Sequence, residues 1–245
     1  MTKRLLCITA HPDDEAGNFG GTLAIYGRRG VETSVICLTA GAAARHRGAA
    51  SSDGQLTALR REEFARSCRR LGVSHGEVLD YPDGKLASAQ VLKVTSDLVL
   101  RIRRIRPDVV LTFGPEGGVT AHADHAMAGM FASLAFQWAG RDDRFPEQVQ
   151  GGASPHRSRK LYYSTGLITL EGRQPVAQPP VTASIDISAV LDVKLAAFQE
   201  HTTQAPLYSI FQGAVRRHGG FEHWHLAATA EPQRAEFESD LFSGL

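Results

Sequence analysis

The chain has 245 residues, of which 42% are hydrophobic and 22% charged, values typical of a soluble globular protein with a sizeable core. Its 27 Lys and Arg residues nearly balance its 26 Asp and Glu residues, so no global field attracts nucleic acid or an anionic membrane. No stretch reaches the roughly 18 apolar residues that a membrane-spanning helix needs. We therefore expect one domain over residues 1–245 that acts on a small molecule, and the composition leaves open whether it forms a homo-oligomer.

Three cysteines, an odd number, do not predict a disulfide framework. Cys7 and Cys37 lie in apolar runs that we expect to be buried strands, and Cys68 lies in a helical segment. The basic amino-terminal residues precede an apolar stretch that is too short for a signal peptide. These features predict a reducing compartment, the cytoplasm.

Short apolar runs alternate with longer helical patterns along the chain, which is typical of a parallel sheet covered by crossover helices. The predicted strands are residues 4–10, 32–40, 77–81, 108–113 and 160–164. The predicted helices are residues 57–71, 89–105 and 122–138, and the first has a capping-box pattern at 52–55 ahead of it and Gly72 after it. The sequence therefore predicts an α/β fold, a Rossmann-like and mostly parallel sheet with helices on both faces.

The carboxyl-terminal third is less regular, and there we expect a helix over 187–202 and an edge strand over 221–226. The segments that read as loops are rich in Gly, Ala, Ser, Pro and charge, and they are residues 41–54, 82–86, 141–159 and 171–180. The first two follow strands directly, at the sheet edge where open α/β proteins bind ligands. We expect these two loops to form the walls of a ligand-binding site.

Polar side chains concentrate where two predicted strands end. The segment Ala10-His11-Pro12-Asp13-Asp14-Glu15 follows the first strand, and Thr120-Ala121-His122-Ala123-Asp124-His125 follows the fourth. Carboxyl ends of parallel strands meet at one edge of a sheet, so we expect the two clusters to lie together. Two imidazoles and one carboxylate are a common catalytic zinc set that leaves a position for water.

Together, the AHPDDE and H-x-D-H motifs resemble those of the PIG-L/LmbE family of zinc N-deacetylases, which act largely on N-acetylglucosamine conjugates. Either motif alone is weak, but the pair is highly specific. The resemblance extends over most of the chain through RREEF at 60–64, Leu71-Gly72-Val73, Asp83-Gly84, Asp186-Ile187-Ser188, His201 with Gln204, and Asp240-Leu241-Phe242.

The resemblance also implies roles for individual residues. His11, Asp14 and His125 match the metal ligands, Asp13 the general base, His122 the histidine that stabilises the tetrahedral intermediate and protonates the leaving amine, and Asp124 its orienting carboxylate. Zn2+ polarises an amide carbonyl and lowers the pKa of its bound water toward about 7. Fe2+ suits the same ligands. A neighbouring carboxylate can then accept the remaining proton, and a protonated imidazole can stabilise the oxyanion.

Each of these residues also has a structural interpretation. Asp13 and Asp14 could simply cap a helix, and His122 and His125 could be exposed residues without a function at the start of another helix. The two motifs in this order favour a functional site. Arg60 either grips a sugar hydroxyl or an anionic aglycone, or is an exposed helix residue in contact with a glutamate three positions later.

Three further polar positions stay open or favour a structural role. Asp83 binds sugar or only forms a turn in Tyr-Pro-Asp-Gly. His223 and His225 share a strand face but have no carboxylate or cysteine partner in register, which favours a structural role. His201 is ambiguous, although its neighbour Gln204 matches the family.

Two other function classes fit the sequence less well than a hydrolase does. A Rossmann nucleotide-dependent enzyme needs a G-x-G-x-x-G after the first strand, where this chain has His-Pro-Asp-Asp, and Gly17, Gly20 and Gly21 come too late. A non-catalytic metal- or carbohydrate-binding module would not need the acid–base set. The sequence therefore predicts hydrolysis of an N-acyl amide, in particular N-acetyl, on a soluble amino-sugar conjugate, because no basic amphipathic helix suggests a membrane-lipid substrate.

Overall fold

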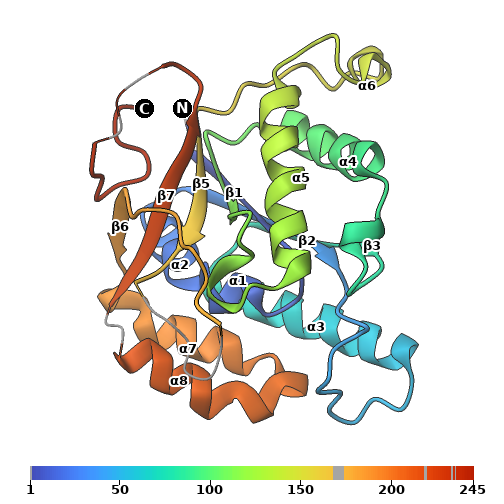
Figure 1. The fold of residues 1–245 in the computed structure, drawn as a ribbon, viewed down its shortest axis with the longest axis vertical. Helices are drawn as coiled ribbons and strands as arrows, with labels where there is room; N and C mark the ends of the chain where they lie inside the picture. The colour runs from blue at the N-terminus through green and yellow to red at the C-terminus, as the bar shows by residue number, and fades with distance from the viewer. Residues whose placement is uncertain (1, 168–173, 218–219, 233, 235) are drawn as a thin grey trace.

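The computed structural model describes residues 2–167, 174–217, 220–232, 234 and 236–245. Its strands join one sheet in the order β3-β2-β1-β4-β5-β7-β6 (Figure 1). They are β1 (Arg4–Thr9), β2 (Glu32–Thr39), β3 (His75–Tyr81), β4 (Val109–Phe113), β5 (Lys160–Thr165), β6 (Ala183–Asp186) and β7 (Phe221–Thr229). The strands β1 to β5 are mutually parallel, whereas β7 is antiparallel to both of its neighbours. The predicted α/β fold with a mostly parallel sheet is confirmed.

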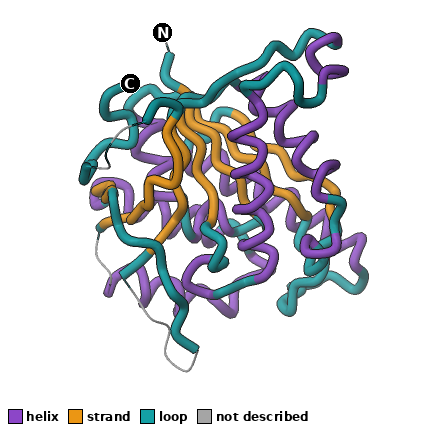
Figure 2. The backbone as a smooth tube through the Cα atoms, turned by 45° about the horizontal axis from the view of Figure 1, so that its top comes forward, coloured by secondary structure: helices purple, strands orange, loops and turns teal. Residues whose placement is uncertain are grey.

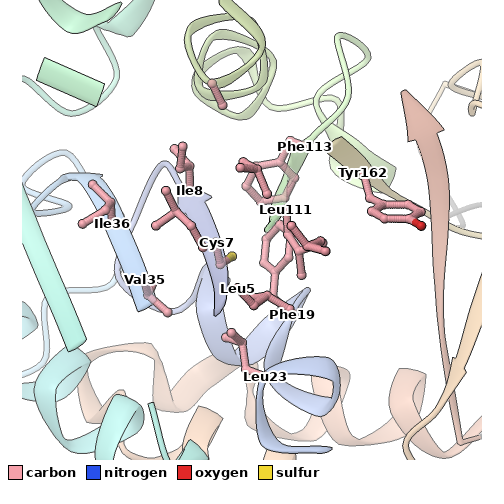
Figure 3. Packing of buried hydrophobic residues seen from close by; sticks show 14 of the residues in the cluster. Leu5, Cys7, Ile8, Phe19, Leu23, Val35, Ile36, Leu111, Phe113 and Tyr162 are labelled. Carbon is pink, nitrogen blue, oxygen red and sulfur yellow. The ribbon is translucent and has the colours of Figure 1, made fainter. Parts of the chain in front are cut away.

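The central strands are buried on both faces, as near-continuous apolar runs in parallel sheets require. Every residue of β4, and every residue of β1 after Arg4, is fully buried. Figure 3 shows Leu5 and Ile8 of β1 among side chains of the neighbouring strands, with Phe19 and Leu23 on the side of Leu5. Each such aliphatic side chain contributes about 1.5–3 kcal/mol by leaving water. This core fixes the positions at which the strands end.

Helices cover both faces of the sheet (Figure 2). On one face, α2 (Gly20–Arg28), α3 (Asp53–Leu71) and α7 (Leu191–Gln199) pack together, and α8 (Tyr208–Arg217) lies beside α7. On the other face, α4 (Val91–Ile105) packs against α5 (Ala123–Ala139). The short α1 (Asp14–Gly17) follows β1 directly. The predicted cap of α3 is confirmed, because Ser52 accepts a hydrogen bond from the Gln55 amide and Gly72 ends the helix at φ 73°.

Several elements differ from the sequence-based expectation. The strand predicted over 221–226 is present as part of β7, but its predicted edge position is wrong, since β7 lies between β5 and β6 and its Trp224 is fully buried. Helices α2 and α8 and strand β6 were not predicted, and α6 (Pro146–Gln150) interrupts the predicted loop over 141–159. The helix predicted over 187–202 is confined to α7, between two 3₁₀ turns.

The loops expected to wall a site follow β2 and β3. Residues 41–52 form no helix or strand before α3 begins, and residues 82–85 precede a 3₁₀ turn at Leu86–Ser88. In the loop predicted over 171–180, residues 174–180 form no helix or strand, and residues 171–173 lie outside the described residues. Helix α6 lies at the opposite end of the molecule from loop 41–52 (Figure 1).

Candidate active site

The first motif forms a tight turn that its own Asp14 side chain stabilises. Asp14 Oδ2 accepts hydrogen bonds from the amides of Ala10, at 3.1 Å, and His11, at 2.8 Å. The buried Asp14 then starts α1, where a carboxylate suits the helix dipole. Asp13 lies within the turn at φ 113°, a backbone conformation that L-residues rarely adopt. The turn thus points two consecutive aspartates in different directions.

The second motif opens α5 and faces the first. His125 Nε2 lies 3.0 Å from Asp14 Oδ1, and His11 Nδ1 lies 3.6 Å from Asp14 Oδ2. The His125 ring also stacks on Phe113 at the end of β4, with 4.0 Å between ring centroids. The structure therefore brings together His11, Asp14 and His125, the three residues expected to hold a metal.

The donor set around His11 suits a cation. The ligand atoms of His11, His122 and His125 lie within 4.8 Å of one another, as do those of His11, Asp83 and Asp124. Burial acts to lower the pKa of His11, but hydrogen bonds to Asp124 and Asp83 and the charge of Asp14 raise it to about 10. A cluster with this negative potential favours positive charge, and a divalent ion would replace the proton on His11. The residues present therefore fit a metal ion.

Asp13 lies beside this cluster and is held by Arg60 of α3. Arg60 Nη2 lies 2.8 Å from Asp13 Oδ2, and the same guanidinium donates to the carbonyl oxygens of Pro12 and Gly41. Burial raises the pKa of Asp13, and the Arg60 charge opposes that shift without cancelling it. Arg60 is only 3% exposed, so of its two interpretations the exposed helix residue is wrong. Its predicted partner Glu63 instead accepts hydrogen bonds from Thr202 and Thr203.

Asp83 reaches the same cluster and is more than a turn residue. Its Oδ1 lies 3.1 Å from His11 Nε2, and its Oδ2 accepts a hydrogen bond from the Ala43 amide at 2.7 Å. The charge and hydrogen bond of His11 help to hold the pKa of Asp83 below its usual value, against the effect of burial. Asp83 therefore joins the turn over 82–85 to the loop over 41–52 beside the candidate metal ligands.

The position of Asp124 corrects one expectation. Its carboxylate was expected to orient His122, but it accepts hydrogen bonds from the amides of Gly84, at 2.7 Å, and Leu86, at 3.2 Å, and lies 3.4 Å from His11 Nε2. Only the backbone N–H of Asp124 meets His122, donating to Nδ1 at 3.2 Å. The carboxylate thus supports His11 and the turn after β3.

The protonation of His122 also differs from the expectation. Burial and the neighbouring His11 and His125 lower the pKa of His122, which opposes the protonated ring that the sequence suggested. Since Nδ1 accepts the bond from the Asp124 amide, the neutral ring carries its proton on Nε2. That N–H is a hydrogen-bond donor without a net charge.

A buried network beneath Asp13 was not found from the sequence. Glu15 Oε1 accepts hydrogen bonds from Ser67 Oγ, at 2.5 Å, and His201 Nε2, at 2.6 Å, while Glu15 Oε2 accepts the Asp13 amide at 2.9 Å. Glu15, Ser67 and His201 are fully buried. The family resemblance marked Glu15 and His201, but no local pattern predicts a contact between residues 186 positions apart.

His223 and His225 lie outside the site. His223 Nδ1 is 2.7 Å from Ser184 Oγ, and His225 Nδ1 is 2.9 Å from the Pro180 carbonyl oxygen. In the part of the chain that the structure describes, neither belongs to a cluster of three candidate metal ligands. These contacts agree with the structural role favoured for both.

The amino terminus of α2, where a Rossmann enzyme would bind phosphate, already has a partner. The Glu222 carboxylate of β7 accepts hydrogen bonds from the amides of Gly21, at 2.8 Å, and Thr22, at 2.7 Å. Lys194 Nζ lies 2.6 Å from the same carboxylate and balances its charge. A nucleotide phosphate would have to displace this buried pair.

A cluster of candidate metal ligands with an adjacent, partly buried carboxylate, at the carboxyl edge of a Rossmann-like sheet, is typical of the active site of a metal-dependent hydrolase. The model of the PIG-L family, described as GlcNAc-PI de-N-acetylase, matches residues 6–136. The chain belongs to this family, and it is an amidohydrolase of the deacetylase class.

Individual relatives agree with the family. The chain is 30% identical to 1D-myo-inositol 2-acetamido-2-deoxy-alpha-D-glucopyranoside deacetylase 2 of Catenulispora acidiphila, over 99% of this chain and 97% of that protein. It is 33% identical to the diacetylchitobiose deacetylase of Thermococcus kodakarensis, over 83% of this chain and 71% of that protein. The fold matches N,N'-diacetylchitobiose deacetylase from Pyrococcus horikoshii with a TM-score of 0.77 and 24% identity, over 91% of this chain and 83% of that one.

Proposed function

We propose that this protein is a zinc-dependent hydrolase that removes the acetyl group from the amide nitrogen of an N-acetylglucosamine conjugate. The observation that carries the proposal is the contact of Asp14 with His11 and His125, with Asp13 held beside them by Arg60. The names of the two relatives support the substrate class, because each describes the deacetylation of an N-acetylated glucosamine unit.

In this proposal His11, Asp14 and His125 hold the ion. The Asp124 carboxylate, another candidate donor, already holds two amides of the turn after β3, and His122 is assigned to the substrate through its Nε2–H. Bound zinc would supply a Lewis acid for the amide carbonyl and a water of lowered pKa. Zinc is preferred to ferrous iron because two imidazoles and one carboxylate form a common catalytic zinc set.

Two residues of the chain perform the proton chemistry. Asp13 lies beside the ligands, and Arg60 fixes its carboxylate, so it is placed to accept a proton from the attacking water. His122 presents its Nε2–H, and this donor stabilises the negative charge that develops on the carbonyl oxygen. Asp124 supports the site through His11 and the turn after β3, and Asp83 and Arg60 shape the site edge next to the substrate.

The alternative of a non-catalytic binding module is disfavoured by the Asp13–Arg60 pair. Burial of a charged pair has a desolvation cost, and metal binding alone does not need a second carboxylate that contacts arginine. The nucleotide-dependent alternative is disfavoured by Glu222, which occupies the amino terminus of α2.

The test is amine release from a panel of N-acetylated amino sugars by the zinc-loaded protein. We expect release from at least one glucosamine conjugate, loss of activity after chelation, and recovery with zinc or ferrous iron. Zinc bound at one equivalent without amine release from any member would instead support the binding module.

We also propose that the chain forms one domain and acts in the cytoplasm. A single domain is supported by the sheet, which takes strands from Arg4 through to Thr229. A cytoplasmic location is supported by Cys7, Cys37 and Cys68, which are all buried and free. No helix among the described residues is long and apolar enough to cross a membrane.

A further inference from the structure

A buried carboxylate adjoins the backbone of the proposed general base. Glu15 of α1 is fully buried, and its Oε2 accepts a hydrogen bond from the Asp13 amide at 2.9 Å. Its Oε1 accepts hydrogen bonds from Ser67 Oγ of α3, at 2.5 Å, and from His201 Nε2, at 2.6 Å. Burying a carboxylate is costly, and three donors offset much of that cost. Glu15 therefore connects the turn that carries Asp13 to two segments that are distant in the sequence.

The peptide between Pro12 and Asp13 is held from both sides. Its carbonyl oxygen accepts a hydrogen bond from Arg60 Nη2, and its N–H donates to Glu15 Oε2. Asp13 has φ 113°, a conformation that persists in an L-residue only where the surrounding structure fixes it. Since φ is the rotation that links this peptide to the side chain of Asp13, fixing the peptide also fixes where the carboxylate points.

The Glu15 carboxylate takes its orientation from His201. A carboxylate only accepts hydrogen bonds, so His201 Nε2 carries the proton of this contact. The backbone of His201 is anchored, because its N–H donates to the Phe198 carbonyl oxygen and its own carbonyl oxygen accepts the Gln204 amide. Its Nδ1 is buried and has no hydrogen-bond partner among the described residues. An unpartnered buried nitrogen costs free energy that a leucine would not incur, so the contact with Glu15, rather than packing, accounts for a histidine here.

We propose that His201 is a positioning residue of the hydrolase: through Glu15 it fixes the peptide before Asp13, and with it the direction of the Asp13 carboxylate. Glu15 and His201 are both 0% exposed, so neither reaches a substrate and both act only through Asp13. A displacement of about 1 Å in a reacting group can lower a rate about 10²-fold. The proposal rests on the proposed function for its effect on catalysis, but not for its effect on the position of Asp13.

Glu63 supplies a matched control for Glu15 in the zinc-loaded protein. It is also a buried carboxylate, but it accepts its hydrogen bonds from Thr202 and Thr203 rather than from Asp13. Glu15→Gln places an amide donor against at least one of the three existing donors. We expect it to lower kcat about 10²-fold while KM and zinc content stay unchanged. Glu63→Gln should lower the urea midpoint of unfolding by a similar amount but leave kcat unchanged.

Two substitutions of His201 separate its hydrogen bond from its volume. His201→Leu removes the donor to Glu15, whereas His201→Gln keeps a neutral N–H donor of similar reach. We expect His201→Leu to lower kcat about tenfold with unchanged KM and zinc content, and His201→Gln to recover most of that loss. Unchanged kcat in His201→Leu, equal losses in its two variants, or zinc loss that accounts for the lower kcat would overturn the proposal. A loss of kcat in Glu63→Gln as large as that in Glu15→Gln would do the same.

Amide hydrogen exchange followed by NMR tests the position of Asp13 without any substrate. His201→Leu and Glu15→Gln should speed exchange of the Asp13 amide about tenfold, whereas His201→Gln and Glu63→Gln should leave it unchanged. Equal exchange in the wild-type protein and His201→Leu would contradict the proposal. If the wild-type protein releases amine from no N-acetylated amino sugar, the proposed function fails, and the exchange measurement alone decides whether His201 positions Asp13.

Discussion

The guanidinium of Arg60 lies 2.8 Å from the Asp13 carboxylate while also donating to the carbonyl oxygens of Pro12 and Gly41. One side chain of α3 therefore fixes both the side chain of the proposed base and the backbone on either side of the cluster. The strained backbone of Asp13, at φ 113°, is held by this contact and by Glu15. This makes Arg60 a positioning residue in the proposed mechanism.

Replacing Arg60 with Lys should lower kcat about 10²-fold while leaving zinc content unchanged, because one ammonium cannot make the same set of contacts. Arg60→Ala should also destabilise the fold by about 1–3 kcal/mol, since it leaves the partly buried Asp13 carboxylate and the carbonyl oxygens of Pro12 and Gly41 without their donor. Kinetics, zinc analysis and urea unfolding measure the three effects. Loss of zinc from Arg60→Lys, with normal kcat for the loaded fraction, would assign Arg60 to the metal site instead.

Asp13 and Asp14 are chemically identical and should respond oppositely to substitution. Asp13→Asn should keep its zinc and lose about 10²- to 10⁴-fold in kcat, because the amide cannot accept the proton. Asp14→Asn should lose zinc, because a neutral oxygen is a poorer ligand for a dication. Metal content and kcat of the two variants, measured side by side, decide the assignment. Zinc loss in Asp13→Asn alone would reverse the roles, and full activity of that variant would refute the mechanism.

The His201–Glu15 contact should make stability depend on pH. Burial acts to lower the pKa of His201, but Glu15 and Asp13 raise it above its ordinary value of 6.5 in the folded protein. A raised pKa means that the folded state binds the proton more tightly, so the stabilisation is complete below pH 6.5 and is lost as pH rises through the folded pKa.

Urea unfolding between pH 6 and 9 should therefore show stability that falls with pH in the wild-type protein. His201→Gln should reduce this dependence without removing it, because His11, whose pKa is also raised, still contributes, and His75→Gln, at an exposed position of β3, should leave the dependence unchanged. Identical pH profiles for wild type and His201→Gln would remove the histidine as the source.

Two glycine substitutions should have opposite effects on stability. A Cβ at Gly21 would lie 2.4 Å from the Ile187 side chain, so Gly21→Ala should destabilise by about 1–3 kcal/mol. A Cβ at Gly54 in α3 meets nothing within 4 Å, so Gly54→Ala should be neutral or stabilise by up to about 1 kcal/mol. Midpoints of chemical unfolding report both values. A stabilising Gly21→Ala would mean that α2 is not as close to Ile187 as described.

The sequence predicted the parallel half of the fold because its strands are buried on both faces and appear as continuous apolar runs. It missed α2 because three glycines, at 20, 21 and 27, weaken the helical pattern, although close packing at Gly21 requires the first pair to stay small. It placed β7 at an edge because β6 has only four residues and gives almost no periodic signal.

The sequence likewise predicted only part of the candidate site. Motifs located His11, Asp14 and His125, since each follows a strand that the apolar pattern identifies. They did not predict that Arg60 would contact Asp13, or that the Asp124 carboxylate would serve the turn after β3. Those partners depend on how α3 and the turn pack on the sheet, and this packing has no local sequence signal.

The Glu222 carboxylate that closes the amino terminus of α2 lies about 200 positions along the chain from the amides it accepts, 201 from Gly21 and 200 from Thr22. During synthesis, therefore, these helix amides stay hydrated until the chain has been made as far as Glu222. Contacts of such high sequence separation form slowly. The amino terminus of α2 would thus lack its carboxylate partner until β7 is synthesised and pairs with the sheet. Pairing of β7 would then be a late step in the folding of the nascent chain.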